Sequence, residues 1–221
     1  MNVSDAVKQR RTIRGYRPES VPDEVIRDIL EHARYAPSNS NIQPWHIAIF
    51  SGAARQQLQA AIEAELDAGT KPYPTWPSGG VGLHGIYKER RRACGYGYYN
   101  TMGVSRDNKA GQAALLRKNW EFFGAPHVAF FSMPDTMHRA NAVDMGILLQ
   151  TIMLLMTERG ISSCPQGALA SYPGPVYQMA DIPQGNAILF GLSFGYADEA
   201  AQINEVRMQR EPYNAFTSLI S

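Results

Sequence analysis

The sequence predicts one α+β domain over residues 1–221, with a few buried strands packed against amphipathic helices. Two near-continuous apolar runs, Pro126–Met133 and Ala187–Tyr196, have the length of buried strands. Apolar residues recur at helical spacing in 22–33 and 53–66, which predicts two helices that each bury one face. No internal repeat or linker divides the chain, and a chain of this length buries roughly 70–75% of its unfolded surface in one core.

Local signals place the elements of the N-terminal part. Val3–Gln9 is expected to be a short helix with Ser4 or Asp5 near its start, and Arg10–Pro18 is expected to be extended. Pro22 and the two acidic residues after it favour a helix start, because acidic side chains stabilise the positive end of the helix dipole.

The second half of the chain is predicted to contain the central helix. Asp144–Arg159 has the composition of a buried helix, and Gly160 is placed to end it. Its apolar stretch, Met145–Met156, is shorter than the ~20 residues that span a bilayer, so we expect a core helix and not a membrane span. Residues 46–50 and Ile161–Ala168 are predicted strands, the second of which runs into a tight turn.

Composition and charge argue against several classes of function. The formal net charge is +1, which gives no reason to expect binding to nucleic acid or to an anionic membrane. The two cysteines, Cys94 and Cys164, are too few for a disulfide scaffold, and the five histidines are scattered without metal-ligand spacing. The N-terminus has no secretory pattern. We therefore expect a cytoplasmic protein with no metal site.

Residues 70–119 are expected to form an irregular excursion that covers a substrate. Prolines and glycines punctuate its first third, and the glycine spacing matches neither a dinucleotide-binding nor a phosphate-binding loop. A long irregular segment in a compact domain is commonly a lid or a binding segment, with a disordered loop as the alternative. Arg90, Arg91 and Arg92 are more consistent with a solvated helix face than with a site.

A stiff polar loop precedes the strand at 46–50. Pro37 and Pro44 restrict the backbone at both ends, and the side chains between them are mostly Ser and Asn. Hydroxyl and amide groups both donate and accept hydrogen bonds, so this loop suits a polyhydroxylated or heterocyclic ligand better than a simple anion. An ordinary helix-to-strand loop is the alternative.

Arginines crowd the segment after the first helix. In an extended chain Arg10, Thr12 and Arg14 lie on one face, and two guanidinium groups beside a hydroxyl are suited to binding a phosphate. A solvated basic edge is the alternative. The turn at 164–167 offers further backbone N–H groups, while Cys164 is better explained as a small core residue than as a nucleophile. Together these features favour an organic cofactor with a phosphate tail.

Four motifs carry a resemblance to a known family. They are Arg10-Arg11-Thr12-Ile13-Arg14, Pro37-Ser38-Asn39-Ser40-Asn41-Ile42-Gln43-Pro44-Trp45, Cys164-Pro165-Gln166-Gly167 and Arg207-x-x-Arg210-x-Pro212. In order and separation they closely resemble the FMN-dependent nitroreductase family over about residues 5–214. The long aromatic segment 70–119 resembles the subgroup that acts on nitrobenzoates and dinitroanilines.

The resemblance implies a nitroreductase-like fold, in which helices flank a mostly antiparallel sheet and two chains form an intertwined homodimer with FMN at the interface. It implies that the phosphate, ribityl chain and pyrimidine edge of FMN meet Arg10, Thr12 and Arg14, with Arg207 or, preferably, Arg210 closing on the phosphate. The flavin ring is expected to contact Pro37, Ser38, Asn39 and Asn41 from the neighbouring subunit, and Pro165, Gln166 and Gly167, with a backbone N–H directed at N5. Arg11, Gln150 and Cys164 complete the expected cofactor site, and Tyr96, Tyr98, Tyr99 and Trp120 are expected to contact the substrate ring.

The implied activity is a ping-pong reduction. NADH or NADPH gives a hydride to flavin N5 and leaves, and a nitroaromatic substrate then takes its place, with no catalytic side chain required. Three alternatives remain open. They are reduction of activated double bonds or halophenols on the same scaffold, the flavin-cleaving reaction of vitamin B12 ligand synthesis, and flavin binding without catalysis.

Overall fold

A four-stranded antiparallel sheet lies at the centre of the protein in a computed structural model that describes residues 1–77, 79 and 82–220. The strand order is β1 (His46–Ser51), β2 (His127–Pro134), β4 (Asn186–Gly195) and β3 (Ser162–Gln166). Phe50 pairs with Val128, and Cys164 pairs with Ser193. The strands predicted from apolar runs are confirmed, because β2 and β4 lie between neighbours and bury both faces.

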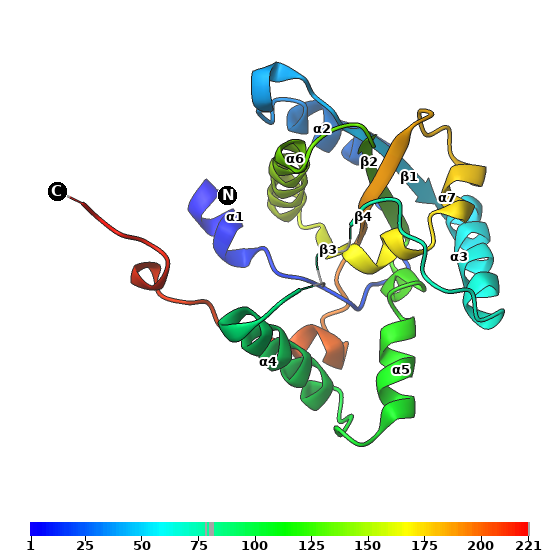
Figure 1. Ribbon diagram of the computed structural model, residues 1–221, viewed down its shortest axis with the longest axis vertical. Helices are drawn as coiled ribbons and strands as arrows, with labels where there is room; N and C mark the ends of the chain where they lie inside the picture. Colours follow the sequence, from blue (N-terminus) through cyan, green and yellow to red (C-terminus); the bar gives the residue numbers. More distant parts are fainter. Residues whose placement is uncertain (78, 80–81, 221) are drawn as a thin grey trace.

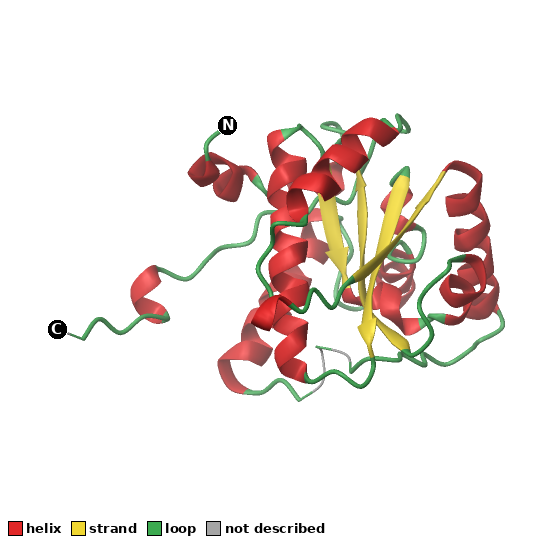
Figure 2. Ribbon diagram, turned by 90° about the horizontal axis from the view of Figure 1, so that it is seen from above, coloured by secondary structure: helices red, strands yellow, loops and turns green. Residues whose placement is uncertain are grey.

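Helices cover both faces of the sheet, as Figures 1 and 2 show. On one face α2 (Asp23–Ala33) and α6 (Arg139–Glu158) pack in a cluster that includes Ile29, Phe131 and Met145. On the other face α3 (Gly52–Asp67) and α7 (Gly174–Met179) pack in a second cluster that includes Leu58 and Phe130. Alternate residues of β2 thus point into two separate apolar layers, which is the period expected of a strand.

The central helix α6 begins five residues earlier than the predicted Asp144. His138 and Asn141 form a capping box at its start, in which the Asn141 side chain accepts from the His138 N–H at 3.2 Å. The first turn is polar, so the apolar pattern does not reveal it. The predicted end is confirmed, because Gly160 has a φ of 71° and the Ile161 N–H donates back to the Met156 carbonyl oxygen at 2.8 Å.

Length and composition alone would allow α6 to cross a membrane. Its buried residues nevertheless pack against α2 and the sheet, as Met145, Leu148 and Ile152 do, which is the arrangement of a core helix. Only a third of its most apolar stretch is buried within the chain, and Val143 is 61% exposed. One side of α6 is therefore left for another contact.

The expectation of an irregular segment over residues 70–119 is wrong for two stretches within it. Helices α4 (Gly85–Thr101) and α5 (Lys109–Arg117) occupy most of its second half. Neither has a broad apolar stripe: α4 has no buried residue and α5 buries Leu115 alone. The helical period therefore has little signal in the sequence. Arg90 and its two neighbours lie on the exposed surface of α4, as predicted.

The first helix, α1 (Val3–Gln9), has the predicted bounds but a different cap. The side chain of Asn2, and not that of Ser4 or Asp5, caps it, because the Asn2 carbonyl oxygen Oδ1 accepts from the Asp5 N–H at 2.9 Å.

His127 fastens the N-terminal part of the chain to β2. It is 2% exposed, its Nε2 accepts from the Val21 N–H at 2.9 Å, and its Nδ1 lies 2.6 Å from the Ser51 hydroxyl. Because Nε2 is an acceptor, the neutral ring must hold its proton on Nδ1 and donate it to Ser51. Burial lowers the pKa of His127 below its usual value.

We expect acid to destabilise the protein through His127 before its carboxylates titrate. The unfolded chain binds this proton near pH 6.5, about the ordinary histidine pKa, and the folded chain binds it only at lower pH. The contribution of His127 to the free energy of unfolding is therefore fully present above about pH 6.5. Below that pH the free energy of unfolding falls by up to about 1.4 kcal/mol per pH unit, until the folded-state pKa is reached. Urea denaturation from pH 7.5 to 5 measures this slope.

Two variants separate this effect from other titrations. His127→Gln should be less stable at pH 7.5 but should lose less stability between pH 6.5 and 5. His84→Gln, at an exposed histidine, should follow the parent curve. Parallel curves for the parent protein and His127→Gln would contradict the assignment.

Candidate functional site

The arginine-rich segment Arg10–Gly15 lies along the outer edge of β3. Thr12 forms a parallel bridge with Ser163, and the Ile13 N–H donates to the Ser163 carbonyl oxygen at 3.1 Å. Ile13 is 2% exposed and anchors the segment in the core. The predicted extended conformation is confirmed, because this backbone pairs with the edge of a sheet.

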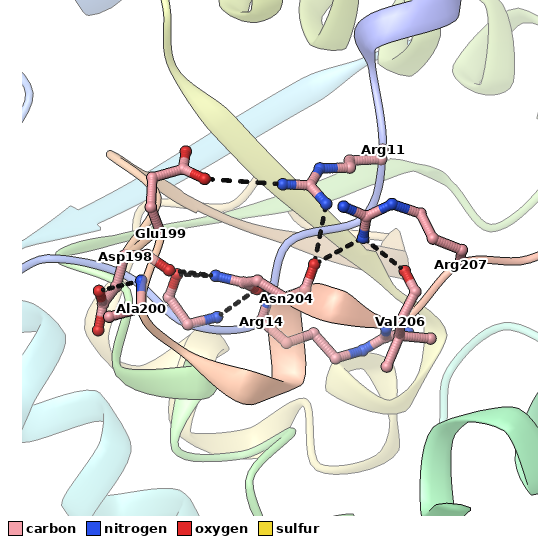
Figure 3. Close-up of polar contacts among 9 residues, drawn as sticks. Arg11, Arg14, Asp198, Glu199, Ala200, Asn204, Val206 and Arg207 are labelled. Carbon is pink, nitrogen blue, oxygen red and sulfur yellow. Dashed lines mark hydrogen bonds and ion pairs between the residues drawn. The ribbon is translucent and has the colours of Figure 1, made fainter. Parts of the chain in front are cut away.

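Arg11 and Arg207 converge on one backbone carbonyl (Figure 3). Arg11 Nη1 donates to the Asn204 carbonyl oxygen at 2.8 Å, and Arg207 Nη1 donates to the same oxygen at 2.7 Å. Among the described residues, Arg11 pairs with the exposed carboxylate of Glu199 at 3.9 Å, and Arg207 pairs with no carboxylate. Two like charges with one weak counter-ion make a site suited to an anion.

Arg10 and Arg210 add positive charge nearby. Burial and the charge of Arg210 both lower the pKa of Arg10 below its usual value, although Arg10 remains protonated at neutral pH. Arg210 Nη1 donates to the carbonyl oxygens of Met208 and Gln209 in its own tail, at 3.1 and 3.2 Å. Arg207 is therefore held against the buried Asn204, whereas Arg210, the residue that the family resemblance favours for the phosphate, is held by its own tail. We call Arg10, Arg11, Arg207 and Arg210 the arginine cluster.

A groove of about 170 Å³ opens beside the arginine cluster. Arg10 and Arg11 line one side of it, and Ser162 and Ser163 at the start of β3 line another. Guanidinium N–H and hydroxyl groups are the donors that bind phosphate oxygens in proteins.

Arg14 lies in more apolar surroundings than the arginine cluster. Its guanidinium carbon is 5.2 Å from the centre of the Tyr98 ring and 5.6 Å from that of Phe123, so it makes cation–π contacts with both. It also lies beside Cys164, which is 1% exposed. Burial raises the pKa of the Cys164 thiol to about 11, so the thiol stays protonated at neutral pH. Cys164 is a core residue, as predicted from its sequence context.

The turn after β3 exposes the backbone of Gly167 and buries the side chain of Gln166. Gln166 is buried, its Nε2 donates to the Asn119 carbonyl oxygen at 2.9 Å, and its Oε1 accepts from the Ser193 hydroxyl. Gly167 is exposed, and a Cβ built on it would meet no atom within 4 Å. A ligand at this turn would therefore meet its backbone and not the side chain of Gln166.

The polar loop after α2 has a strained backbone. Ser40, Asn41 and Gln43 have φ angles of 50°, 56° and 47°, a left-handed region that residues other than glycine rarely adopt. The Asn39 N–H donates to Oδ1 of the buried Asp144 at 3.0 Å, which fixes the loop against α6. Backbone strain of this kind persists only where the surrounding structure imposes it, and it clusters at binding sites.

This loop lies far from the arginine cluster of its own chain (Figure 1). Asp144, which holds the loop, is near the start of α6, whereas Ser163, which holds the arginine-rich segment, follows the other end. At 1.5 Å per residue these ends are about 20 Å apart. Within one chain the structure does not bring the two predicted halves of the site together. Pro37, Asn39 and Asn41 are exposed and Ser38 is half-buried.

The remaining predicted residues fall in different places. Gln150 is half-buried on α6. Trp120 is half-buried, and its Nε1 donates to the Ala168 carbonyl oxygen at 3.2 Å, beside the turn after β3. Tyr98 lies over Arg14 and packs against Tyr99 at 5.6 Å, whereas Tyr96 is exposed on α4.

Two buried polar residues of the site, Asn204 and Asp144, are not predicted as site residues from the sequence. Asn204 is 5% exposed in an unpatterned segment near the C-terminus, so nothing in the sequence marks it. Asp144 is 4% exposed, and its Oδ2 has no partner among the described residues. The sequence does offer one signal for Asp144, because it is an acidic residue at the start of an apolar helical run. A carboxylate buried at such a position needs a hydrogen-bond partner, so the residue indicates a polar contact at that end of the helix.

Comparison with known proteins agrees with this geometry. The model of the nitroreductase family matches residues 7–196. The chain belongs to the nitroreductase family. Nitroreductase NfnB of Mycolicibacterium smegmatis is 40% identical over 204 residues, which are 92% of this chain and 86% of that protein. The 4-nitrobenzoate reductase of Pseudomonas putida is 34% identical over 212 residues, 96% of this chain and 92% of that protein.

The nitroreductase fold is equally clear in three dimensions. The crystal structure of the FMN-dependent nitroreductase NfnB from Mycobacterium smegmatis in complex with NADPH superposes with a TM-score of 0.93 at 36% identity, and the match covers 100% of both chains. The family resemblance carried by the four motifs is thereby confirmed, as is the nitroreductase-like fold.

Proposed function

We propose that this nitroreductase binds FMN and uses NADH or NADPH to reduce nitroaromatic compounds. The observation that carries the proposal is the convergence of Arg11 and Arg207 on the Asn204 carbonyl, in a chain similar to an FMN-dependent nitroreductase. The similarity to a 4-nitrobenzoate reductase supports a nitroaromatic acid as the class of substrate to test first.

The residues of the chain fit both ends of FMN. The phosphate has up to two negative charges, and the arginine cluster has four positive charges against the exposed Glu199. At the other end, the open space beside Gly167 leaves the backbone of the turn accessible to a flat ring. Arg14 and the polar loop offer donors for the polar edge of that ring.

When bound, FMN supplies the chemistry by accepting a hydride from NADH or NADPH and passing it to an electron-poor substrate in a second, ping-pong step. The side chains of this protein then bind and orient. The Cys164 thiol beside Arg14 is buried and protonated, so it does not act as a nucleophile. Water can supply the protons, so no side chain is assigned as acid or base.

We further propose that a second copy of the chain completes each site, in a homodimer of single-domain subunits. The polar loop is about 20 Å along α6 from its own arginine cluster, so the loop of the second copy must line the ring. The exposed side of α6 and the apolar tail after Pro212, which projects from the body in Figures 1 and 2, offer the surface for that contact. We place the dimer in the cytoplasm, where its two free cysteines stay reduced and NAD(P)H is supplied.

A visible spectrum of the purified full-length protein tests the function. We expect flavin absorption that bleaches when NADPH or NADH is added without oxygen and returns when 4-nitrobenzoate follows. A colourless protein that takes up no added FMN would contradict the proposal. Flavin that neither nucleotide bleaches would support a binding protein without catalysis. Faster return with an enone or a halophenol than with 4-nitrobenzoate would reassign the substrate class.

A further inference from the structure

Asn204 occupies the point where the two halves of the arginine cluster meet. It belongs to the short 3₁₀ turn Gln202–Glu205, three residues before Arg207. Its side chain crosses to the segment at the other end of the chain, where Oδ1 accepts from the N–H groups of Arg14 and Gly15 at 2.8 and 3.0 Å. Figure 3 shows this side chain between the two segments.

The rest of the Asn204 amide is used as well. Nδ2 donates to the carbonyl oxygens of Gly15 and Asp198, at 2.8 and 2.9 Å. Both side-chain amide hydrogens and the carbonyl oxygen therefore have partners, and all of them are backbone groups. Because Asn204 is 5% exposed, these bonds are little weakened by water and hold the residue in one orientation.

This orientation fixes the position of the Asn204 backbone carbonyl. It accepts from Arg11 Nη1 at 2.8 Å and from Arg207 Nη1 at 2.7 Å. Two guanidinium groups repel one another in the absence of an anion, so a fixed carbonyl between them is needed to keep both in place. The side-chain bonds of Asn204 set where that carbonyl lies.

The backbone at Gly15 packs closely against the segment that contains Asn204. A Cβ built on Gly15 would lie 2.5 Å from the Ala201 Cβ and 3.1 Å from Asn204 Nδ2. The segment after Arg14 and the turn Gln202–Glu205 therefore approach so closely that only glycine fits between them.

We propose that Asn204 is a positioning residue, which holds Arg11 and Arg207 at the spacing that a phosphate group requires. The proposal rests on the proposed function, because the phosphate is taken to be that of FMN. Asn204 does not need to touch the ligand. Its contribution is to preorganise two cations that would otherwise separate.

The experiment compares FMN with riboflavin, which lacks the phosphate. Dissociation constants of both are measured by flavin fluorescence on the flavin-stripped full-length protein and on Asn204→Ala. We expect FMN affinity to fall about 10-fold or more in Asn204→Ala, with riboflavin affinity changed less than about 3-fold. Hydrogen exchange should show faster exchange of the Arg14 and Gly15 amides.

Asn186→Ala is the matched control, since Asn186 bonds Ser132 from its side chain at the far end of β4. It should lower the melting temperature and leave the FMN-to-riboflavin ratio unchanged. If Asn204→Ala does not fold, Gly15→Ala takes its place. Its loss of FMN preference should be partly restored by adding Ala201→Gly, which removes the clashing Cβ.

The outcomes separate the two proposals. A parent protein that binds FMN no better than riboflavin would overturn the proposed phosphate site itself. A parent protein that prefers FMN, with a variant that keeps the same preference, would overturn the role of Asn204 alone. If Asn204→Ala weakens FMN and riboflavin binding by the same factor, Asn204 has a merely structural role. That result would also overturn the positioning role.

Discussion

Replacing Arg207 with alanine is expected to weaken FMN binding by about 30- to 150-fold, because one charge-assisted contact to a phosphate contributes roughly 2–3 kcal/mol. Arg207 is the arginine that reaches the Asn204 carbonyl from the C-terminal segment, so its guanidinium is held before the ligand arrives. Riboflavin affinity should change far less, since riboflavin has no phosphate. Titration of flavin-stripped protein with each flavin measures both values.

Two further variants sharpen this prediction. Arg210→Ala should lower FMN affinity only a few-fold, because Arg210 bonds the carbonyls of its own tail, whereas Arg207 bonds the carbonyl of the buried Asn204. Arg34→Ala removes an exposed arginine that pairs with Glu31 at the end of α2, and it should have no effect. A larger loss in Arg210→Ala than in Arg207→Ala would return the phosphate contact to Arg210, the residue that the family resemblance favours.

The parts of the fold that depend on a regular pattern could be predicted from the sequence. The strands β2 and β4 are apolar throughout because both of their faces are buried, and Gly160 ends α6 because only glycine adopts its φ of 71° without strain. Helices α4 and α5 cannot be predicted in this way, for the complementary reason. They bury almost nothing within the chain, so the sequence holds no stripe that would reveal them.

The candidate site could be predicted only as separate pieces. Each motif was visible, but the contact from Arg11 to Asn204 joins residues 193 positions apart, and no local pattern encodes it. The position of the polar loop depends on the bond from Asn39 to Asp144, which joins residues 105 positions apart, and no local pattern encodes it either. The second chain is implied by the family resemblance, and the separation of about 20 Å along α6 supports that proposal.

Deleting residues 213–221 is expected to weaken the proposed homodimer by about 100-fold or more and to release FMN with it. Tyr213, Phe216, Leu219 and Ile220 are all at least 68% exposed in the single chain. Burying these four side chains contributes roughly 6–12 kcal/mol per tail, and ordering the tail offsets most of it. A net of about 3 kcal/mol is enough for a 100-fold change in the dimer dissociation constant. Sedimentation at several protein concentrations measures the dimer dissociation constant.

The flavin content of the truncated protein makes this test specific to a shared site. If the loop of the second copy lines the ring, monomer formation must remove that loop, and bound FMN should fall in step with the dimer fraction as the protein is diluted. Leu116→Ser, at a half-exposed leucine on α5 on the opposite side of the molecule from the tail in Figure 1, should leave both the dimer and its flavin unchanged. A truncated protein that sediments as a monomer and still keeps its full flavin would show that one chain holds the cofactor alone. It would then require the polar loop to reach its own arginine cluster, about 20 Å along α6, which the bond from Asn39 to Asp144 opposes.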